Sequence, residues 1–302
     1  NRSTNRPGDA TGAAAVKICL LVNEDLAGNL ALNHLLPPLA GKHRLRVYLS
    51  SKVGTQQALP PELAMLRFLE QDLFRELLFP ALDTGDPAGT LLSFQRLSRY
   101  TDQPIRTLNR INSQESLAEL ASAEADLILS IRYGGILREQ AIALPAMGVI
   151  NLHSGLLPDY RGVMATFRAM LNREKHIGTT LHYISDPGID TGDIINTTSL
   201  SVEPDRSYLW HVLNLYPAAC DLLLQSVEQL AAGHSLDRRP QPLGGNYFSF
   251  PVEEELQAFN QMGLKLFDVE EVSAFAKHYI KRDLHGLPPT GPDVGGLSSR
   301  ST

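Results

Sequence analysis

Cysteine is scarce in this 302-residue sequence. Only Cys19 and Cys220 occur, and each stands alone within an apolar run. This excludes a disulfide framework and a Cys-x-x-Cys metal site, and it favours a reducing, cytoplasmic environment. Cysteine usage therefore gives no reason to expect a small secreted scaffold.

An excess of one charge and long apolar runs are also missing. The 27 Lys and Arg residues and 33 Asp and Glu residues give a net charge of -6, without a block of like charge. This disfavours a nucleic-acid partner that needs a broad basic surface. No apolar run approaches the roughly 20 residues of a membrane helix. The composition, 43% hydrophobic and 20% charged, predicts a soluble globular protein.

Short apolar runs alternate with helix-like spacing along most of the chain. Strands are predicted at residues 16–22, 45–51, 105–111, 126–134, 148–154, 177–185 and 192–202. Helices are predicted at residues 26–39, 59–79, 113–125, 136–145, 164–174 and 207–233, the first of them ended by Pro37 and Pro38. This alternation indicates an α/β fold with a mainly parallel sheet.

Changes in composition divide the chain into four parts. Residues 1–15 are polar and small and are expected to form a flexible leader, and residues 16–233 form the α/β domain. Residues 234–282 combine a turn-rich link, an aromatic cluster around Tyr247 and helical pieces, which predicts a small C-terminal helical appendage. Residues 283–302 resemble a disordered tail. The aromatic cluster is expected to pack the appendage onto the core, with an acceptor platform as the alternative.

Polar side chains follow two of the predicted strands. In "INLHSGLLPDYRG", Asn151 and His153 are two residues apart and would point to the same side of a strand, and Asp190 follows a later strand. The amide and a protonated imidazole can donate hydrogen bonds to an oxygen that becomes negative. The carboxylate could hold the imidazole and help take a proton from an attacking amine. The set suits acyl transfer without an enzyme nucleophile, and it is a poor zinc set, so we expect no metal.

The stretch "NLHSGLLPDYRG", followed by "GTTLHYISDPGIDTGDII", resembles the paired signature of formyltransferases that use 10-formyltetrahydrofolate. The likeness includes "YGGIL" and the helix after residue 209, and so covers about residues 16–233. It implies a Rossmann-like sheet with helices on both faces, formyl-folate as the donor, and Asn151, His153 and Asp190 as the catalytic set. No G-x-G-x-x-G follows the first strand, so no dinucleotide is expected.

The resemblance also implies a folate pocket in which backbone groups contact the pteridine. Its expected members are Tyr133, Gly134, Gly135, Ile136, Leu137, Gly155, Leu156, Leu157, Pro158, Asp186, Pro187 and Gly188. Two positions depart from the family pattern, because the family often has Ser at Gly155 and Pro at Ala165. Both lie beside the expected acceptor path.

Other polar residues near the motifs have two interpretations each. His182 either takes part in function or only bonds to the backbone, and Asp193 is expected to be a solvated strand-edge residue. Arg132 and Arg161 either reach anionic groups of a ligand or lie over apolar neighbours at the surface.

The acceptor is expected to be a primary amine of a small molecule, such as an amino sugar or an amino-acid side chain. Glycinamide ribonucleotide is disfavoured because "NEDLAGN" puts Glu24 and Asp25 where that branch binds phosphate. Initiator methionyl-tRNA is disfavoured by the negative charge and the helical C-terminal part. Hydrolysis of formyl-folate and a non-enzymatic folate-binding module are the alternatives. A homodimer is left open.

Overall fold

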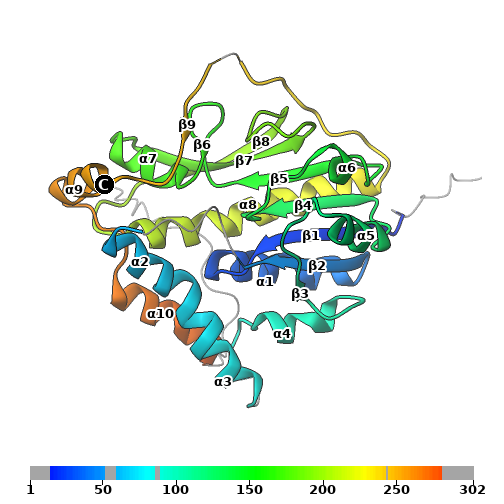
Figure 1. Ribbon diagram of the computed structural model, residues 1–302, viewed down its shortest axis with the longest axis horizontal. Coiled ribbons are helices and arrows are strands. Elements are labelled where there is room, and N and C mark those ends of the chain that lie inside the picture. Colours follow the sequence, from blue (N-terminus) through cyan, green and yellow to red (C-terminus); the bar gives the residue numbers. More distant parts are fainter. Residues whose placement is uncertain (1–13, 52–58, 86–88, 243, 281–302) are drawn as a thin grey trace, which may run out of the picture.

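The computed structural model describes residues 14–51, 59–85, 89–242 and 244–280. The predicted tail lies outside these residues, as does the predicted leader apart from residues 14 and 15. Figure 1 shows a central sheet with helices packed against it and the C-terminal helices at one side.

The sheet has the strand order β3-β2-β1-β4-β5-β7-β8. The five strands on one side are parallel, namely β1 (Lys17–Asn23), β2 (Arg44–Ser50), β3 (Arg106–Thr107), β4 (Leu127–Ile131) and β5 (Val149–His153). Strand β7 (His176–Ile184) runs antiparallel to β5, and β8 (Ile194–Ser201) runs antiparallel to β7. The prediction of a mainly parallel α/β sheet is confirmed.

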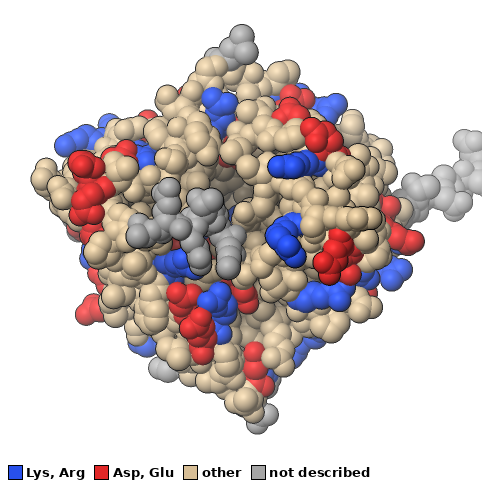
Figure 2. Space-filling view, viewed as in Figure 1, with Lys and Arg blue, Asp and Glu red and all other residues tan. Residues whose placement is uncertain are grey.

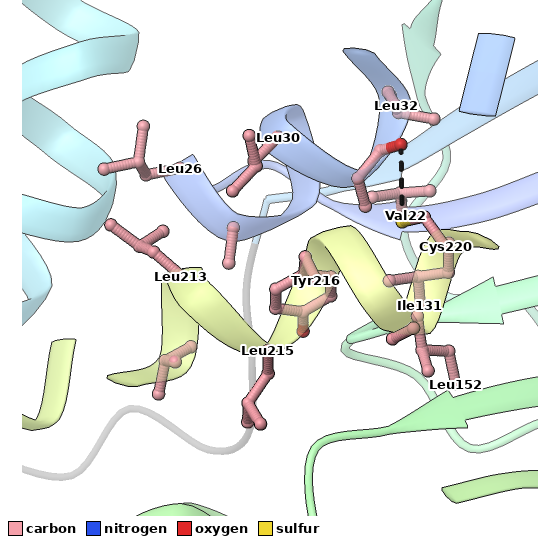
Figure 3. Close-up of a cluster of buried hydrophobic side chains, with 14 of the residues drawn as sticks. Val22, Leu26, Leu30, Leu32, Ile131, Leu152, Leu213, Leu215, Tyr216 and Cys220 are labelled. Carbon is pink, nitrogen blue, oxygen red and sulfur yellow. Dashed lines mark hydrogen bonds between the residues drawn. The ribbon is translucent and has the colours of Figure 1, made fainter. Parts of the chain in front are cut away.

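Helices cover both faces of the sheet, as predicted. The alternation of β1 sends Ile18 and Leu20 into the larger hydrophobic cluster, which also contains residues of α1 (Leu26–Ala40) and α8 (Tyr208–Ala231). Cys19 faces the smaller cluster, to which α5 (Gln114–Ser122) and α6 (Glu139–Ile142) contribute. Burial on both faces explains why these strands are continuously apolar. Figure 3 shows part of the larger cluster, where Tyr216 and Cys220 of α8 face the sheet.

The two prolines predicted to end the first helix lie inside it. Helix α1 continues through Pro37 and Pro38 to Ala40. Each proline removes the N–H that would bond to the carbonyl four residues earlier. Both prolines are exposed, and residues 33 and 34 are only half-buried, so water can reach these carbonyls.

Two other predicted elements are shorter than expected. The strand predicted at 105–111 is reduced to β3, which pairs with β2 at two positions only, and Arg110 beyond it adopts a left-handed backbone conformation (φ 49°) that is not extended. The helix predicted at 136–145 is reduced to the four residues of α6. The helix predicted at 59–79 is present as α2 (Pro61–Arg67), the wider turns of η1 (Phe68–Leu78) and α3 (Phe79–Asp83).

The chain beyond residue 233 lies against the α/β core. Strand β9 (Tyr247–Phe248) pairs in parallel with β6 (Arg161–Gly162), and α9 (Glu253–Gln261) follows. Helix α10 (Val269–Ile280) packs beside η1 and α3, where Tyr279 contacts the rings of Phe74 and Phe79. The Tyr279 hydroxyl donates to Asn29 Oδ1 at 2.6 Å. The remaining short helices are α4 (Phe94–Leu97), η2 (Ser98–Tyr100) and α7 (Ala165–Leu171).

Among the helices in the described ranges, none is both long enough and apolar enough to span a bilayer.

Candidate active site

Strands β5 and β7 place three polar side chains together. Asn151 and His153 alternate onto one side of β5, and the antiparallel register sets His182 of β7 directly opposite Asn151. The His182 and His153 side chains are almost fully buried. The alternation inferred from the sequence therefore holds, and the pairing adds a second histidine.

Asp190 reaches this group from the turn between β7 and β8. Its backbone is left-handed (φ 54°), and its carboxylate is only 11% exposed. Oδ2 lies 3.5 Å from His153 Nδ1 and accepts a 2.9 Å hydrogen bond from the Gly162 N–H. Oδ1 lies 3.4 Å from His182 Nε2 and 3.5 Å from Asn151 Nδ2. The structure thus brings the three predicted catalytic residues into one cluster.

The His153 ring is held from both sides. Its Nε2 lies 2.6 Å from the Tyr160 carbonyl oxygen, which can only accept, so Nε2 carries a hydrogen. Nδ1 faces Asp190, so the protonated ring would donate from both nitrogens. The imidazole is thus fixed between a backbone carbonyl and a carboxylate.

Gly155 is required by the close packing around His153. A Cβ at Gly155 would lie 2.7 Å from His153 Nε2 and 2.6 Å from Ala165 Cβ. The two departures from the family pattern are therefore in direct contact, and Gly155 borders the imidazole.

Asp190 is strongly stabilised as an anion. Burial alone would raise its pKa, but the charge of His153, the His182 side chain and the Gly162 N–H together lower the pKa to about 2. A carboxylate with so low a pKa is a weak base at neutral pH. It is therefore held as an anion between the two imidazole rings.

Three contributors to the site were not predicted from the sequence. The Gly162 N–H and the Tyr160 carbonyl are backbone groups of the loop after β5. The Gln241 side chain donates to the carbonyls of Asp190 at 2.9 Å and Gly192 at 2.7 Å. No local pattern around residue 241 signals this long-range contact.

Several polar groups of the predicted folate segment after β4 form hydrogen bonds within the protein. The Tyr133 hydroxyl donates to the Leu108 carbonyl, the Gly134 N–H donates to Ser50 Oγ at 2.8 Å, and the Ile136 carbonyl accepts from Asn112 at 2.7 Å. The Ile136 side chain is 54% exposed, whereas Leu137 is buried. An apolar side chain is thus presented beside the end of β4.

The other predicted folate contacts differ in accessibility. Gly155 and Leu157 are buried, and Leu156 and Pro158 are half-buried. Asp186 accepts from the Gly188 N–H at 2.7 Å within an exposed turn, and Ile189 of the same turn is 37% exposed. The folate-binding role of these segments stays a prediction.

Asp25, in the loop after β1, forms an ion pair with Arg132, which follows β4. Asp25 accepts from the Gly28 N–H at 2.7 Å, which caps α1, and from Arg132 Nε at 2.8 Å. Burial raises the pKa of nearby Glu70 to about 7, although Arg132 opposes the shift. Asp25 and Arg132 therefore neutralise each other.

The remaining candidates have structural partners. Arg161 donates to the Gly244 carbonyl at 3.1 Å, and Asp193 lies 3.8 Å from Arg238 Nε at the surface. Within the described residues, no group of three or more His, Cys, Asp or Glu side chains is arranged to hold a metal ion.

Comparison with known proteins identifies the class to which this sheet and cluster belong. Residues 86–209 match the family model described as formyl transferase. That range contains Asn151, His153 and Asp190, so the resemblance seen in the motifs is confirmed.

Individual relatives agree with this family. The chain is 30% identical over 197 residues to the methionyl-tRNA formyltransferase of Acidothermus cellulolyticus (strain ATCC 43068 / DSM 8971 / 11B), covering 64% of this chain and 59% of the relative. It is 32% identical over 205 residues to that of Moorella thermoacetica (strain ATCC 39073 / JCM 9320), covering 65% of each. The chain thus spans less than two thirds of these relatives.

The fold also matches a solved structure. A 4-N formyltransferase from Francisella tularensis superposes with a TM-score of 0.53 and 16% identity, covering 80% of this chain and 78% of the other. At this identity the match supports the Rossmann-like fold alone.

Proposed function

We propose that the chain transfers a formyl group from 10-formyltetrahydrofolate to a primary amine of a small-molecule acceptor. The observation that carries the proposal is the contact of Asp190 with both Asn151 and His153 in the family segment. An amide donor, an imidazole and a buried carboxylate within hydrogen-bonding reach are the groups that acyl transfer to an amine requires.

The side chains would act on the formyl carbonyl. Asn151 would donate to its oxygen as the amine nitrogen adds to the carbon and the oxygen becomes negative. His153 would exchange its Nε2 bond to the Tyr160 carbonyl for a bond to the same oxygen. The bond between the formyl carbon and the folate nitrogen then breaks, and the proton lost by the amine passes to that nitrogen. Asp190, with a pKa of about 2, would stay ionised and not hold the proton itself.

The exposed apolar side chains support a flat aromatic donor. Ile136 follows β4, and Ile189 lies on the turn that carries Asp190. Exposed large apolar side chains beside a polar cluster are typical of ligand pockets. Both belong to segments predicted from the motifs to contact folate.

The loop after β1 supports a small, non-phosphorylated acceptor. The carboxylate of Asp25 occupies the N-terminus of α1, where a phosphate group would otherwise bind. Figure 2 shows acidic and basic side chains interspersed on one face. Methionyl-tRNA is a second candidate acceptor, because the relatives matched by sequence carry that name.

Incubation of the purified chain with 10-formyltetrahydrofolate tests the proposal. Separate reactions would contain no acceptor, amino sugars with and without a linked nucleotide, basic amino acids, or initiator methionyl-tRNA, with mass spectrometry of the products. We expect an N-formyl product with a small amine, lost in Asn151→Ala. Formate release at the same rate without any amine would indicate a hydrolase, and turnover with methionyl-tRNA alone would replace the small acceptor.

A further inference from the structure

Tyr247 is an exposed aromatic residue beside the reacting cluster. It lies on β9, which pairs with β6 near the end of β5 (Figure 1), and the residue is 55% exposed. Its ring reaches Gly162 of β6, because a Cβ at Gly162 would lie 2.9 Å from Tyr247 Cε2 and 3.1 Å from Cδ2. The Gly162 N–H in turn donates to Asp190 Oδ2 at 2.9 Å. A single backbone residue therefore separates this ring from the buried carboxylate.

The fold uses the ring of Phe248 but not that of Tyr247. The Phe248 ring stacks on Tyr160 and lies against the Arg168 guanidinium. Within the described ranges, the Tyr247 ring forms no aromatic pair or cation–π contact, and its hydroxyl forms no hydrogen bond. A single exposed tyrosine is ordinary at a protein surface. This one adjoins the residue that binds Asp190, and ligand pockets are commonly lined by aromatic side chains.

Arg161 adds a positive charge next to Tyr247. The two residues are partners in the register of β6 and β9, and partners in such a ladder project to the same face. The Arg161 Nη2 donates to the Gly244 and Gly245 carbonyls at 3.1 and 3.4 Å, and in the part of the chain that the structure describes its guanidinium forms no ion pair. Carbonyls do not neutralise a charge. A second cationic group on the acceptor would therefore be repelled, whereas hydroxyl oxygens could approach.

We propose that Tyr247 is a specificity-determining residue whose ring stacks on the pyranose ring of an amino-sugar acceptor. This inference rests on the proposed function and narrows its acceptor from any small primary amine to an amine carried on a sugar ring. One face of a pyranose is lined by C–H groups and its rim carries hydroxyls, which suits an aromatic ring with a polar tip. The exposed side chain of Ile189 is left to contact the donor.

Two other roles for the ring predict different kinetics. A ring that only braces Gly162 would change kcat with every acceptor, because Asp190 would lose its position. A ring that contacts folate would change the KM for the formyl donor. Stacking on the acceptor predicts a higher KM for sugar amines alone, with kcat and the donor KM little changed.

The experiment compares Tyr247→Ala and Tyr247→Phe with Leu77→Ala, which removes an apolar side chain of similar exposure, 60%, from η1. The acceptors are the free amino hexose that is formylated best and the amino alditol made from it by reduction, which keeps the amine and hydroxyls but has no ring. We expect Tyr247→Ala to raise the KM for the hexose by about 5- to 10-fold, the range for loss of one aromatic contact. Tyr247→Phe and Leu77→Ala should stay within about twofold of the unchanged chain, since both keep the ring.

The alditol separates stacking from a general effect on the site. Its KM should exceed that of the hexose in the unchanged chain and should hardly change in Tyr247→Ala. Equal KM values for the two acceptors, a parallel rise of both in Tyr247→Ala, or a change confined to kcat or to the donor KM would overturn the stacking role. Formylation of other amines but of no amino hexose would overturn it too. Absence of formyl transfer to any amine would instead overturn the proposed function.

Discussion

Asp190 is held by contacts from three separate parts of the chain. Gly162 supplies a backbone N–H, and His153 and His182 supply imidazole nitrogens from two strands. Together they outweigh the cost of burying a carboxylate. The residue is therefore expected to contribute to stability as well as to reactivity.

Asp190→Asn tests both contributions. The folded-state pKa of about 2 lies below the usual 3.8, so the stabilisation is complete above about pH 4 and is lost as the pH falls through 2. We expect the free energy of unfolding of the variant at pH 7 to be about 2 kcal/mol lower than that of the unchanged chain. The difference should shrink as the pH falls from 4 towards 2, as measured by urea titration.

Asp205→Asn is the matched control, since it changes an exposed carboxylate outside the cluster. A stability difference between Asp190→Asn and the unchanged chain that is independent of pH would contradict this account. Formyl transfer should be lost in Asp190→Asn and retained in the control.

The sequence predicts the reacting side chains better than the groups that hold them. Asn151 and His153 share a short strand, so alternation alone places them together. Asp190 was placed by the resemblance, because no local rule says that the turn folds back over the sheet. Gly155 is the clearest example of what sequence does not predict, because its contacts with Ala165 and the His153 ring are visible only in the folded structure.

At the scale of elements, the pair β6 and β9 fixes the loop that carries Gly162. The Val163 N–H donates to the Phe248 carbonyl at 2.9 Å, and the Phe248 ring lies against Tyr160 and the guanidinium of Arg168. Gln241 joins the same C-terminal link to the turn that carries Asp190. Both loops of the site are therefore held by residues after 233.

Gln241→Leu should loosen the turn between β7 and β8. Loss of two hydrogen bonds to backbone carbonyls is expected to cost about 1–2 kcal/mol of stability. It should lower kcat for formyl transfer by about tenfold, because Asp190 would leave its position beside His153. Steady-state kinetics and urea unfolding measure the two effects.

Gln257→Leu, on the exposed side of α9, controls for the added apolar side chain. Equal kinetics in the two variants would show that Gln241 has no part in positioning the turn.

Element boundaries depended on contacts that periodicity does not contain. The prolines in α1 were predicted to end the helix, yet the exposure of its last turn allows the helix to continue. The strand at 105–111 has suitable residues, but it lies at the edge of the sheet and pairs over only two positions. The long runs of β1, β4 and β5 were predicted well because burial on both faces requires apolar residues throughout.

At the scale of the molecule, α10 ties the end of the described chain to its first helix. Tyr279 is fully buried, with its ring among Phe74 and Phe79 and its hydroxyl on Asn29 of α1. The Gly89 backbone lies against that of Tyr279, which leaves no space for a side chain. This contact is remote from the cluster around Asp190.

Tyr279→Phe should lower the free energy of unfolding by about 1 kcal/mol, because it removes one buried hydrogen bond while keeping the ring. Formyl transfer per folded molecule should not change. Tyr247→Phe alters an exposed tyrosine and should leave stability unchanged in the same urea titration. Equal stabilities of the two variants would show that the bond to Asn29 contributes nothing.

The hydrogen bonds made by Gln241 and β9 also affect the stage of translation at which the site can be completed. A ribosome that has just added Ala231 has already synthesised every reacting side chain, but not the residues that brace their loops. The last of these bracing contacts comes from Phe248. The nascent chain would therefore contain the reacting groups for some time before its two loops are fixed in position. Activity would begin only after Phe248 has been translated.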